Sequence, residues 1–448
     1  MNIPQYVNDA LITLEKAGFE AYLVGGCVRD SLLGISPNDW DVCTVATPEQ
    51  IQAVFAHNVV IPTGIQHGTV TVICNDIPLE ITTYRTESEY HDHRHPETVT
   101  FVKTIEEDLS RRDFTVNAIA YHPSRGIVDP YDGVSDLKSR TLRAVGNPRK
   151  RFEEDALRIL RAFRFACVYG FDIEECTKTA MLDRADLLQH VAAERIQSEL
   201  KRLLMGAYVR VAVHELYPIL FSVLPELEAC RGVDQHSPYH CFDVLVHSIS
   251  CVGQAQPDLS VRLAALLHDI GKPICFTIDS QGVGHFFGHA SISKDLAHDA
   301  LSRLRFDSKT IEEVCILIQY HDVVIEATRP TVRRWLNKLG VDRFRKLLAV
   351  KKADTLAQNP ELIPDRIQKI ETLQEILNSI LEEQACFCIR DLDVNGNDIQ
   401  SLGIVQGPAV GRCLQWLLEE VMEQRIPNIK QELLDAVRKK LDYFMKNR

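Results

Sequence analysis

The sequence lacks the features that mark membrane, secreted and disulfide-stapled proteins. No apolar run reaches the about 18–20 residues that a membrane span requires. The N-terminal segment also has no basic region followed by an apolar stretch, as a secretory signal would. The thirteen cysteines are scattered and include no CxxC pair, which argues against a disulfide framework or a zinc ribbon. We therefore expect a cytoplasmic protein with no membrane contact.

Basic residues are also in the minority, with 50 Lys and Arg against 62 Asp and Glu and a formal net charge of -12. This balance excludes a broadly basic nucleic-acid binder, but binding depends on local charge. Between residues 138 and 164 the balance is reversed, because this segment has nine basic and three acidic residues. RNA contacts confined to such a segment would involve few phosphates and give a modest salt dependence.

The hydrophobic pattern divides the 448 residues into two regions. Before about residue 140, short β-branched runs predict strands at 21–26, 38–45, 68–74 and 79–85. These runs lie too close together for a helix between each pair, which favours a small mixed or antiparallel sheet. From about Asn147 onward the pattern is that of amphipathic helices. The predicted fold class is α+β, predominantly α, with a mixed-sheet head followed by an all-α body.

A pair of acidic residues is the first candidate site. Asp39 and Asp41 stand two apart on a predicted strand, so both carboxylates project from one face. Neighbouring carboxylates repel each other unless cations neutralise them, and oxygen ligands favour Mg²⁺. Glu80, on a nearby strand, is a candidate third carboxylate. Such a site activates a hydroxyl nucleophile and stabilises a pyrophosphate leaving group.

A phosphate-binding turn precedes this acidic pair. Gly25 and Gly26 follow the first predicted strand, and Arg29 comes three residues later. Glycines allow a backbone to approach a phosphate closely, and a guanidinium offers it several donors.

Four segments in succession carry a resemblance to a known family. They read VGGCVRDSLLG, NDWDVCT, RRDFTVNAIAY and RFEEDALRILRAFRFA, and they begin at residues 24, 38, 111 and 151. In order and spacing they resemble the class II tRNA nucleotidyltransferase and bacterial poly(A) polymerase family. The resemblance implies a polymerase-beta-like nucleotidyltransferase head, a helical neck, a body and a tail. It also implies transfer of nucleotides to an RNA 3′ end.

The same resemblance implies roles for individual residues and a division of the chain. Asp39 and Asp41 would hold Mg²⁺, and Gly26 and Arg29 would contact the triphosphate. Four further residues would lie near the nucleotide, the last two on its sugar side: Arg111, Arg112, Asp113 and Asn117. The expected domains are a nucleotidyltransferase head (1–140), a neck that recognises the base (141–225), an HD domain (226–345) and a helical body and tail that binds tRNA (346–448).

Selection of the nucleotide base is predicted from residues spaced by three. Asp155, Arg158, Arg161 and Arg164 are expected on one stripe of a helix. Cytosine and adenine both present an amino donor beside a ring-nitrogen acceptor, whereas guanine and uracil present a carbonyl beside an N–H. An aspartate that only accepts and an arginine that only donates fit the first pattern and mispair with the second. The resemblance assigns this role to Asp155 and Arg158.

The same four motifs occur both in enzymes that add CCA and in enzymes that add poly(A). Residues 62–72 are neutral and contain glycine, which resembles the CCA-adding branch, so tRNA, CTP and ATP are the expected partners. The polar segment 84–101 resembles the flexible loop that such enzymes use when switching from C to A addition. Poly(A) addition, or addition of only CC or only A, stays open as an alternative.

Half of the sixteen histidines lie between residues 236 and 322. His247, His268, Asp269 and Asp322 resemble the H…HD…D pattern of HD phosphohydrolases, with His321 as an alternative last ligand. Adjacent His and Asp side chains can chelate a divalent ion and activate a bound water. The sequence thus predicts a second divalent metal of unspecified identity. It leaves two alternative interpretations: an HD phosphohydrolase or phosphodiesterase with an RNA- or nucleotide-binding head, and a protein that binds RNA or senses nucleotides without catalysis.

Overall fold

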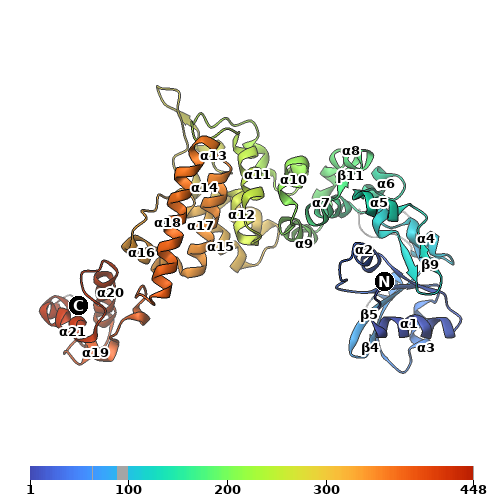
Figure 1. The fold of residues 1–448 in the computed structure, drawn as a ribbon, viewed down its shortest axis with the longest axis horizontal. Helices are drawn as coiled ribbons and strands as arrows, with labels where there is room; N and C mark the ends of the chain where they lie inside the picture. The colour runs from blue at the N-terminus through green and yellow to red at the C-terminus, as the bar shows by residue number, and fades with distance from the viewer. Residues whose placement is uncertain (63, 88–98, 447–448) are drawn as a thin grey trace. The chain divides into compact units, whose positions relative to one another are not determined.

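A computed structural model of the protein describes residues 1–62, 64–87 and 99–446 (Figure 1). The chain forms two compact units, which are treated separately below. Unit 1 comprises Met1–Glu228 and Arg303–Phe306, and unit 2 comprises Ala229–Ser302 and Asp307–Arg448. None of the described helices is both long and apolar enough to cross a bilayer.

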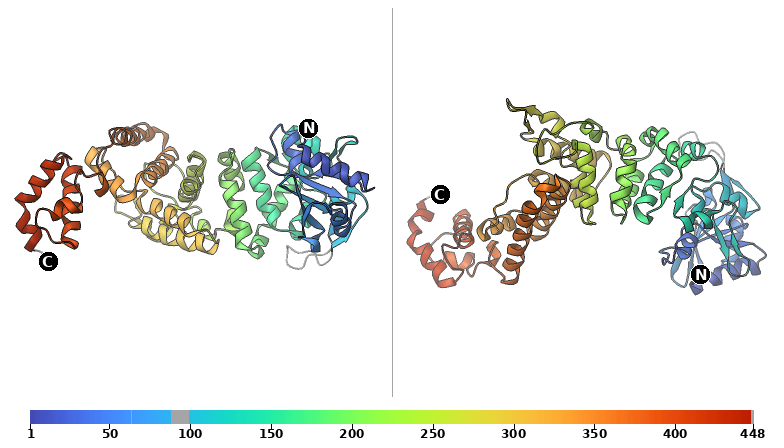
Figure 2. Two further views of the ribbon diagram at one scale, coloured as in Figure 1. Left: turned by 90° about the horizontal axis from the view of Figure 1, so that it is seen from below. Right: turned by 45° about the horizontal axis from the view of Figure 1, so that its top comes forward.

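A seven-stranded mixed sheet forms the first part of unit 1 (Figures 1 and 2). The strand order is β3-β4-β5-β2-β1-β8-β9. The strands are β1 (Ala21–Val24), β2 (Asp41–Thr44), β3 (Val59–Ile61), β4 (Thr69–Cys74), β5 (Ile77–Thr83), β8 (Ala120–His122) and β9 (Gly126–Val128). Strand β2 pairs antiparallel with β1 and parallel with β5. The four predicted strands and the mixed sheet are confirmed.

The position of each strand explains its residue pattern. In β4 every second residue is buried, as expected for a strand with one face on the core. In β1 all four residues are buried, because the strand lies inside the sheet. Helices α1 (Gln5–Lys16) and α3 (Pro48–Val54) pack against β4 and bury Leu11 and Ile51 (Figure 1).

The predicted switching loop at 84–101 is described only at its two ends. There β6 (Arg85–Glu87) pairs antiparallel with β7 (Val99–Phe101). Residues 88–98, which contain most of this prediction, lie outside the described residues.

The rest of unit 1 is mainly helical. Its longer helices are α2 (Gly26–Leu32), α4 (Ile105–Ser110), α5 (Gly133–Ser139), α6 (Pro148–Glu154), α7 (Leu157–Tyr169), α8 (Glu175–Asp183), α9 (Ala193–Leu204) and α10 (Val209–Leu216). Helix α7 packs against α9 and α10.

The expected helical stripe of Asp155, Arg158, Arg161 and Arg164 is wrong at Asp155, because the chain breaks between α6 and α7. Asp155 has φ -139° and ψ 102°, which is extended backbone. Its Oδ1 accepts a hydrogen bond from the backbone N of Leu157 at 3.2 Å. An Asp side chain that bonds nearby backbone in this way competes with helix formation. Asp155 therefore lies at a corner, and only the three arginines share the helical stripe.

Unit 2 is built almost entirely of helices. They are α11 (Val244–Gln254), α12 (Leu259–Leu267), α13 (Lys272–Cys275), α14 (His289–Arg303), α15 (Ser308–Tyr320), α16 (Arg329–Leu339), α17 (Val341–Leu356), α18 (Ile363–Glu382), α19 (Gly396–Gln400), α20 (Pro408–Met422), α21 (Lys430–Lys439) and α22 (Leu441–Lys446).

Helix α12 is the centre of the first bundle in unit 2. It packs against α11, α15 and α17. Ser260 through Leu267 are all buried, as expected for a helix surrounded by others. The expected boundary at residue 345 falls inside α17, whose buried face completes this bundle. A division there would cut one helix in two, and the expected division of the chain into domains stays a prediction.

Candidate active site and histidine cluster

The acidic pair lies at the start of β2, next to β5. Asp41 pairs in register with Glu80, and Asp39 precedes the strand. Burial raises the pKa of the Asp41 carboxyl to about 6; the Arg112 guanidinium opposes this shift, whereas the carboxylates of Glu80 and Asp39 add to it. Asp39 and Glu80 are exposed. The site is thus an open group of oxygen donors in which negative charge is unfavourable without a cation.

The glycine turn between β1 and α2 allows a close approach of the backbone to an arginine. Gly25 has φ 73°, in the left-handed region, and a Cβ there would lie 2.9 Å from Nη1 of Arg112. Any other residue would be strained and would displace this guanidinium. Gly26 begins α2, and a Cβ there would lie 3.7 Å from Nη2 of Arg29.

Arg29 is buried and holds α2 against α7. It donates from Nε to Asp30 (2.8 Å), from Nη1 to Asn117 (2.7 Å) and from Nη2 to the hydroxyl of Tyr169 (2.8 Å). Its guanidinium also lies 4.8 Å from the centre of the Tyr169 ring. The expected triphosphate contact of Arg29 stays a prediction, since these partners already engage all three of its nitrogens.

The Arg-Arg pair after α4 surrounds a buried acid that sequence reasoning missed. Asp108 accepts from Arg111 (Nη2, 2.8 Å) and from Arg112 (Nη2, 3.1 Å). Burial alone would raise the pKa of the Asp108 carboxyl, but the charges of Arg112 and Arg111 hold it below its usual value. The spacings of three and four residues from Asp108 could have predicted these pairs, although α4 itself ends at Ser110.

Asp113 connects this motif to α7. Arg161 donates to its Oδ2 from Nε (2.9 Å) and Nη2 (2.6 Å). Asn117 donates from Nδ2 to its Oδ1 (2.9 Å). Burial alone would raise the pKa of Asp113, but Arg161 and Asn117 hold it well below its usual range. Asp113 and Asn117 thus join Arg29 to the neck in one polar network.

The two expected base-reading residues lie on either side of the corner between α6 and α7, each with its own partner. Asp155 pairs with Arg195 of α9, whose Nη2 lies 2.9 Å from Oδ2 and whose Nη1 lies 3.3 Å from Oδ1. Arg158 donates to Glu154 (2.8 Å) and to the backbone carbonyl of Arg111 (3.1 Å). Sequence reasoning missed Arg195, because only the packing of α9 on α7 brings it to this corner.

Arg164 is the last member of the predicted stripe. It donates from Nε to Glu199 of α9 at 2.5 Å and lies 4.5 Å from the centre of the Phe165 ring. Each arginine of the stripe therefore faces a different acid. Arg164 fixes α7 to α9.

The structure brings together three of the four expected HD residues. His247, His268 and Asp269 are all buried. The fourth member of the group is Asp354 of α17, whose Oδ1 lies 3.0 Å from Nε2 of His247. Asp322 is exposed and belongs to neither close group of potential metal ligands among the described residues.

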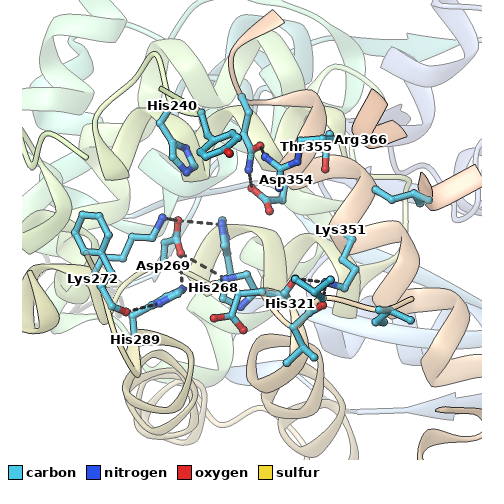
Figure 3. A pocket seen from close by; sticks show the side chains of 18 of the residues that line it. His240, His268, Asp269, Lys272, His289, His321, Lys351, Asp354, Thr355 and Arg366 are labelled. Carbon is cyan, nitrogen blue, oxygen red and sulfur yellow. Dashed lines mark hydrogen bonds and ion pairs between the residues drawn. The ribbon is translucent and has the colours of Figure 1, made fainter. Parts of the chain in front are cut away.

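The alternative ligand His321 does join the cluster. His321 and His289 both face Asp269, at 3.6 Å and 3.4 Å from its Oδ1 (Figure 3). The sequence did not distinguish His289 from the other histidines of its region, so it did not predict that His289 would lie in the cluster. Asp354 had no local signal, because its place depends on how α17 packs against α11 and α12.

Three family models match successive parts of the chain. They are the poly A polymerase head domain (residues 21–143), a probable RNA and SrmB-binding site of polymerase A (170–230), and a putative tRNA nucleotidyltransferase domain 2 (279–437). The first covers the sheet and the acidic pair. Fold and site therefore define the protein as a nucleotidyltransferase.

Similarity to individual proteins identifies the family. The chain is 34% identical over 426 residues to the CCA-adding enzyme of Limosilactobacillus fermentum, covering 95% of this chain and 94% of that one. It is 47% identical over 217 residues to the CCA-adding enzyme of Lacticaseibacillus paracasei, covering 48% and 54%. The protein belongs to the family of CCA-adding enzymes, which are tRNA nucleotidyltransferases that use divalent metal ions.

Solved structures agree in fold. The crystal structure of the Bacillus stearothermophilus CCA-adding enzyme in complex with CTP matches with a TM-score of 0.69 and 29% identity, covering 100% of both chains. The Thermotoga maritima CCA-adding enzyme complexed with tRNA_CCA matches with a TM-score of 0.59 and 17% identity, covering 98% of this chain and 96% of that one. At that identity the second likeness concerns the fold alone.

Proposed function

We propose that this chain adds C, C and A to the 3′ end of tRNA from CTP and ATP, without a nucleic-acid template, and that Asp155 and Arg158 select the base. The observation that carries the proposal is the corner between α6 and α7. It holds an acceptor-only and a donor-only side chain three residues apart, with Arg158 bonded to the backbone of the Arg111-Arg112 motif. The CTP named with the solved relative that is 29% identical and the naming of a relative that is 34% identical as a CCA-adding enzyme support the choice of substrates.

Mg²⁺ is the metal that best fits the head. Asp39, Asp41 and Glu80 offer only oxygen ligands, which suit Mg²⁺. The raised pKa of Asp41 means that a cation at this position would relieve a real charge penalty. When bound, Mg²⁺ would activate the terminal hydroxyl of the RNA and stabilise the pyrophosphate leaving group. The role of the carboxylates is to hold the ion at the edge of the sheet.

Arg158 retains donors for a base. A guanidinium has five N–H donors, and three of them have partners: Glu154, the carbonyl of Arg151 and the carbonyl of Arg111. Within the described part of the chain, two donors remain for the ring-nitrogen acceptor of cytosine or adenine. Asp155 can likewise accept an amino group while bonded to Arg195, because an ionised carboxylate has about four lone-pair positions.

The test measures incorporation into a tRNA that lacks its terminal CCA, using labelled CTP, ATP, UTP or GTP. Wild type should incorporate C and A and reject U and G. Asp41→Ala should lower all incorporation by about 1,000-fold or more, since losing one electrostatic stabiliser of a transition state has an effect of this size. Asp155→Ala should lower discrimination by about 10- to 100-fold, because each mispaired buried polar group costs about 1–3 kcal/mol.

Asp172→Ala is the matched control, because Asp172 is an exposed aspartate of unit 1 on strand β11 (Asp172–Ile173). It should leave rate and selectivity unchanged. Reactions with CTP alone, ATP alone and both distinguish complete CCA addition from addition of only CC or only A, and long A tails would indicate a poly(A) polymerase. Asp155→Ala enzyme that still rejected UTP and GTP as wild type does would overturn the assignment of the selector.

A further inference from the structure

The last residue of α7, Tyr169, has a hydroxyl that no step of the proposed reaction uses. Its oxygen accepts a hydrogen bond from Nη2 of Arg29 at 2.8 Å, and it donates its proton to Oδ1 of Asp30 at 3.3 Å. Burial raises the pKa of this hydroxyl; the charge of Arg29 opposes the shift and that of Asp30 adds to it. The hydroxyl therefore keeps its proton at neutral pH and joins α7 to two residues of α2.

Aromatic packing fixes the ring of Tyr169. The ring stacks on Phe165, with centroids 5.4 Å apart and planes at 23°, and on Phe171, at 5.6 Å and 18°. The Arg29 guanidinium lies 5.0 Å from the centre of the Phe165 ring and 4.8 Å from that of Tyr169. Phenylalanine at position 169 would keep these ring contacts. The hydroxyl can therefore be removed without emptying its place in the stack.

A closed chain of hydrogen bonds begins and ends on α7. Arg161 donates to Asp113, and Asn117 donates to the same carboxylate. Arg29 donates from Nη1 to Asn117 at 2.7 Å and from Nη2 to Tyr169. Arg161 and Tyr169 are about 12 Å apart along the helix axis, at a rise of about 1.5 Å per residue. Arg29 is thus connected to α7 at two separate places.

The partners of Arg29 determine where its remaining donor points. A guanidinium is planar and has five N–H groups. Asp30, Asn117 and Tyr169 accept from its three nitrogens, and the second hydrogen on Nη1 has no partner among the described residues. Three fixed nitrogens define the plane and so the direction of this hydrogen. Without the Tyr169 hydroxyl, the plane is held only from the side of Asp30 and Asn117.

The glycine turn lies beside this guanidinium. Nη2 of Arg29 is 3.7 Å from the place where a Cβ of Gly26 would lie, and Nη1 of Arg112 is 2.9 Å from that of Gly25. Two guanidinium groups therefore flank a turn whose backbone has no side chains of its own. Such a turn lets the backbone approach a phosphate, and guanidinium groups bind phosphate strongly.

Helix α7 carries the proposed base reader Arg158 in its first turn and Tyr169 at its end. We propose that Tyr169 is a positioning residue for nucleotide transfer, because its hydroxyl holds Arg29 in the orientation that meets the triphosphate of CTP or ATP. This role rests on the proposed function and on the triphosphate contact that the sequence predicts for Arg29. Since the base is read at the other end of α7, losing the hydroxyl should weaken the grip on the triphosphate and leave the choice of base unchanged.

The first test measures binding without transfer. Full-length wild-type and Tyr169→Phe proteins are titrated with CTP, inorganic tripolyphosphate and cytidine, with Mg²⁺ present and tRNA left out. Tyr169→Phe should weaken binding of CTP and of tripolyphosphate by the same factor, about tenfold or more, the lower end of what a hydrogen bond to a charged group contributes. Cytidine binding should not change. Equal weakening for all three compounds would show a general loss of structure and would overturn the proposal, as would wild-type affinity for tripolyphosphate.

The second test measures transfer to tRNA that lacks its terminal CCA or ends in CC. In Tyr169→Phe protein, kcat/KM for CTP and for ATP should fall by a common factor of about ten or more, while the ratio between CTP and UTP stays that of wild type. Tyr208→Phe removes the hydroxyl of a tyrosine of the same unit that is 44% exposed, and this matched control should change neither value. Unchanged kcat/KM in Tyr169→Phe would overturn the role of Tyr169. Wild-type protein that binds tripolyphosphate but transfers neither C nor A would overturn the proposed function instead.

The third test asks whether Tyr169 acts through Arg29. Arg29→Lys keeps the charge but loses the planar fork, so one ammonium cannot hold all three partners. In the Arg29→Lys background, Tyr169→Phe should therefore cause little further loss of tripolyphosphate binding. A further loss as large as that in the wild-type background would show that the hydroxyl acts elsewhere and would overturn the proposal. The comparison of tripolyphosphate with cytidine does not depend on this variant.

Discussion

The two units compensate their buried charges in opposite ways. In unit 1 every acid of the polar network has an arginine or amide partner from the chain itself: Asp108 with Arg111 and Arg112, and Asp113 with Arg161 and Asn117. In unit 2 the central acid Asp269 has one lysine and four imidazoles around it and no hydrogen-bond partner among the described residues.

This difference separates two kinds of site. The network of unit 1 is complete without a ligand, so it would hold the proposed base selector in place before substrate arrives, as preorganised sites do. In the cluster of unit 2, imidazoles and carboxylates lie close together with one lysine, and any metal ion bound there would add to the stability of the folded state. In the described part of the head, Asp39, Asp41 and Glu80 form an open site at which a cation would reduce the repulsion between carboxylates.

The largest expected effect comes from removing Asp113, the central acid of the polar network in unit 1. Asp113→Ala leaves Arg161 and the side-chain amide of Asn117 without their acceptor. Breaking a largely buried ion pair from one side costs about 3–5 kcal/mol, and we expect the low end because Arg161 is partly exposed. Hydrogen exchange read by mass spectrometry should show lost protection in unit 1 and none in unit 2. An equal loss of exchange protection in both units would contradict the idea that the two units are stabilised separately.

The same residue predicts a pH dependence. Burial would raise the pKa of Asp113, but Arg161 and Asn117 hold it well below its usual range. Its stabilising contribution is therefore complete above the unfolded pKa of about 3.9 and is lost as the pH falls through the lower folded value. The stability difference between wild type and Asp113→Ala should be constant from about pH 5 to 8 and should shrink below about pH 4. Urea titrations at each pH measure it.

The next largest effect would come from removing the divalent metal that the sequence predicts for the histidine cluster of unit 2. A ligand at 100 to 1,000 times its Kd stabilises the folded state by about 2.7–4.1 kcal/mol. Chelation, with excess Mg²⁺ kept present for the head, should therefore lower exchange protection around α11, α12 and α17 by about 100- to 1,000-fold. Exchange protection in unit 1 should not change on chelation. Asp269→Ala protein serves as the control, because it should already be unprotected and insensitive to chelator.

What the sequence could predict differs between the two sites. Around the head, strands and motifs stand close together in the chain, so local patterns locate β1, β2, Asp41 and Glu80. The helix stripe was wrong at Asp155, because its side chain bonds the backbone of Leu157 and ends the helix. Such competition between a side chain and the helix is decided by local geometry and not by spacing.

In unit 2 the HD pattern predicted His247, His268 and Asp269, with His321 as the alternative to Asp322, but it predicted neither Asp354 nor His289. Asp354 enters the cluster because α17 packs on α11 and α12, and His289 enters at the start of α14. No periodicity relates these positions, since they are brought together only by how the helices pack. Asp322, which the sequence offered beside His321 as the last ligand, is exposed and lies outside both close groups of potential metal ligands among the described residues.

The smallest expected effect concerns Arg195, the partner of Asp155. The two-point contact of its guanidinium with the carboxylate fixes the direction of the remaining lone pairs. Arg195→Ala should therefore lower discrimination between CTP and UTP by less than about tenfold, the scale of about 1 kcal/mol for one hydrogen-bonded contact. Arg195→Lys should rescue it only in part, because an ammonium cannot bind a carboxylate at two points. Arg202→Ala, at an exposed arginine of the same helix, should have no effect.

If Arg195 acts only by positioning Asp155, the double variant Asp155→Ala/Arg195→Ala should discriminate between CTP and UTP no worse than Asp155→Ala alone. Additive losses would instead show that Arg195 contacts the nucleotide directly.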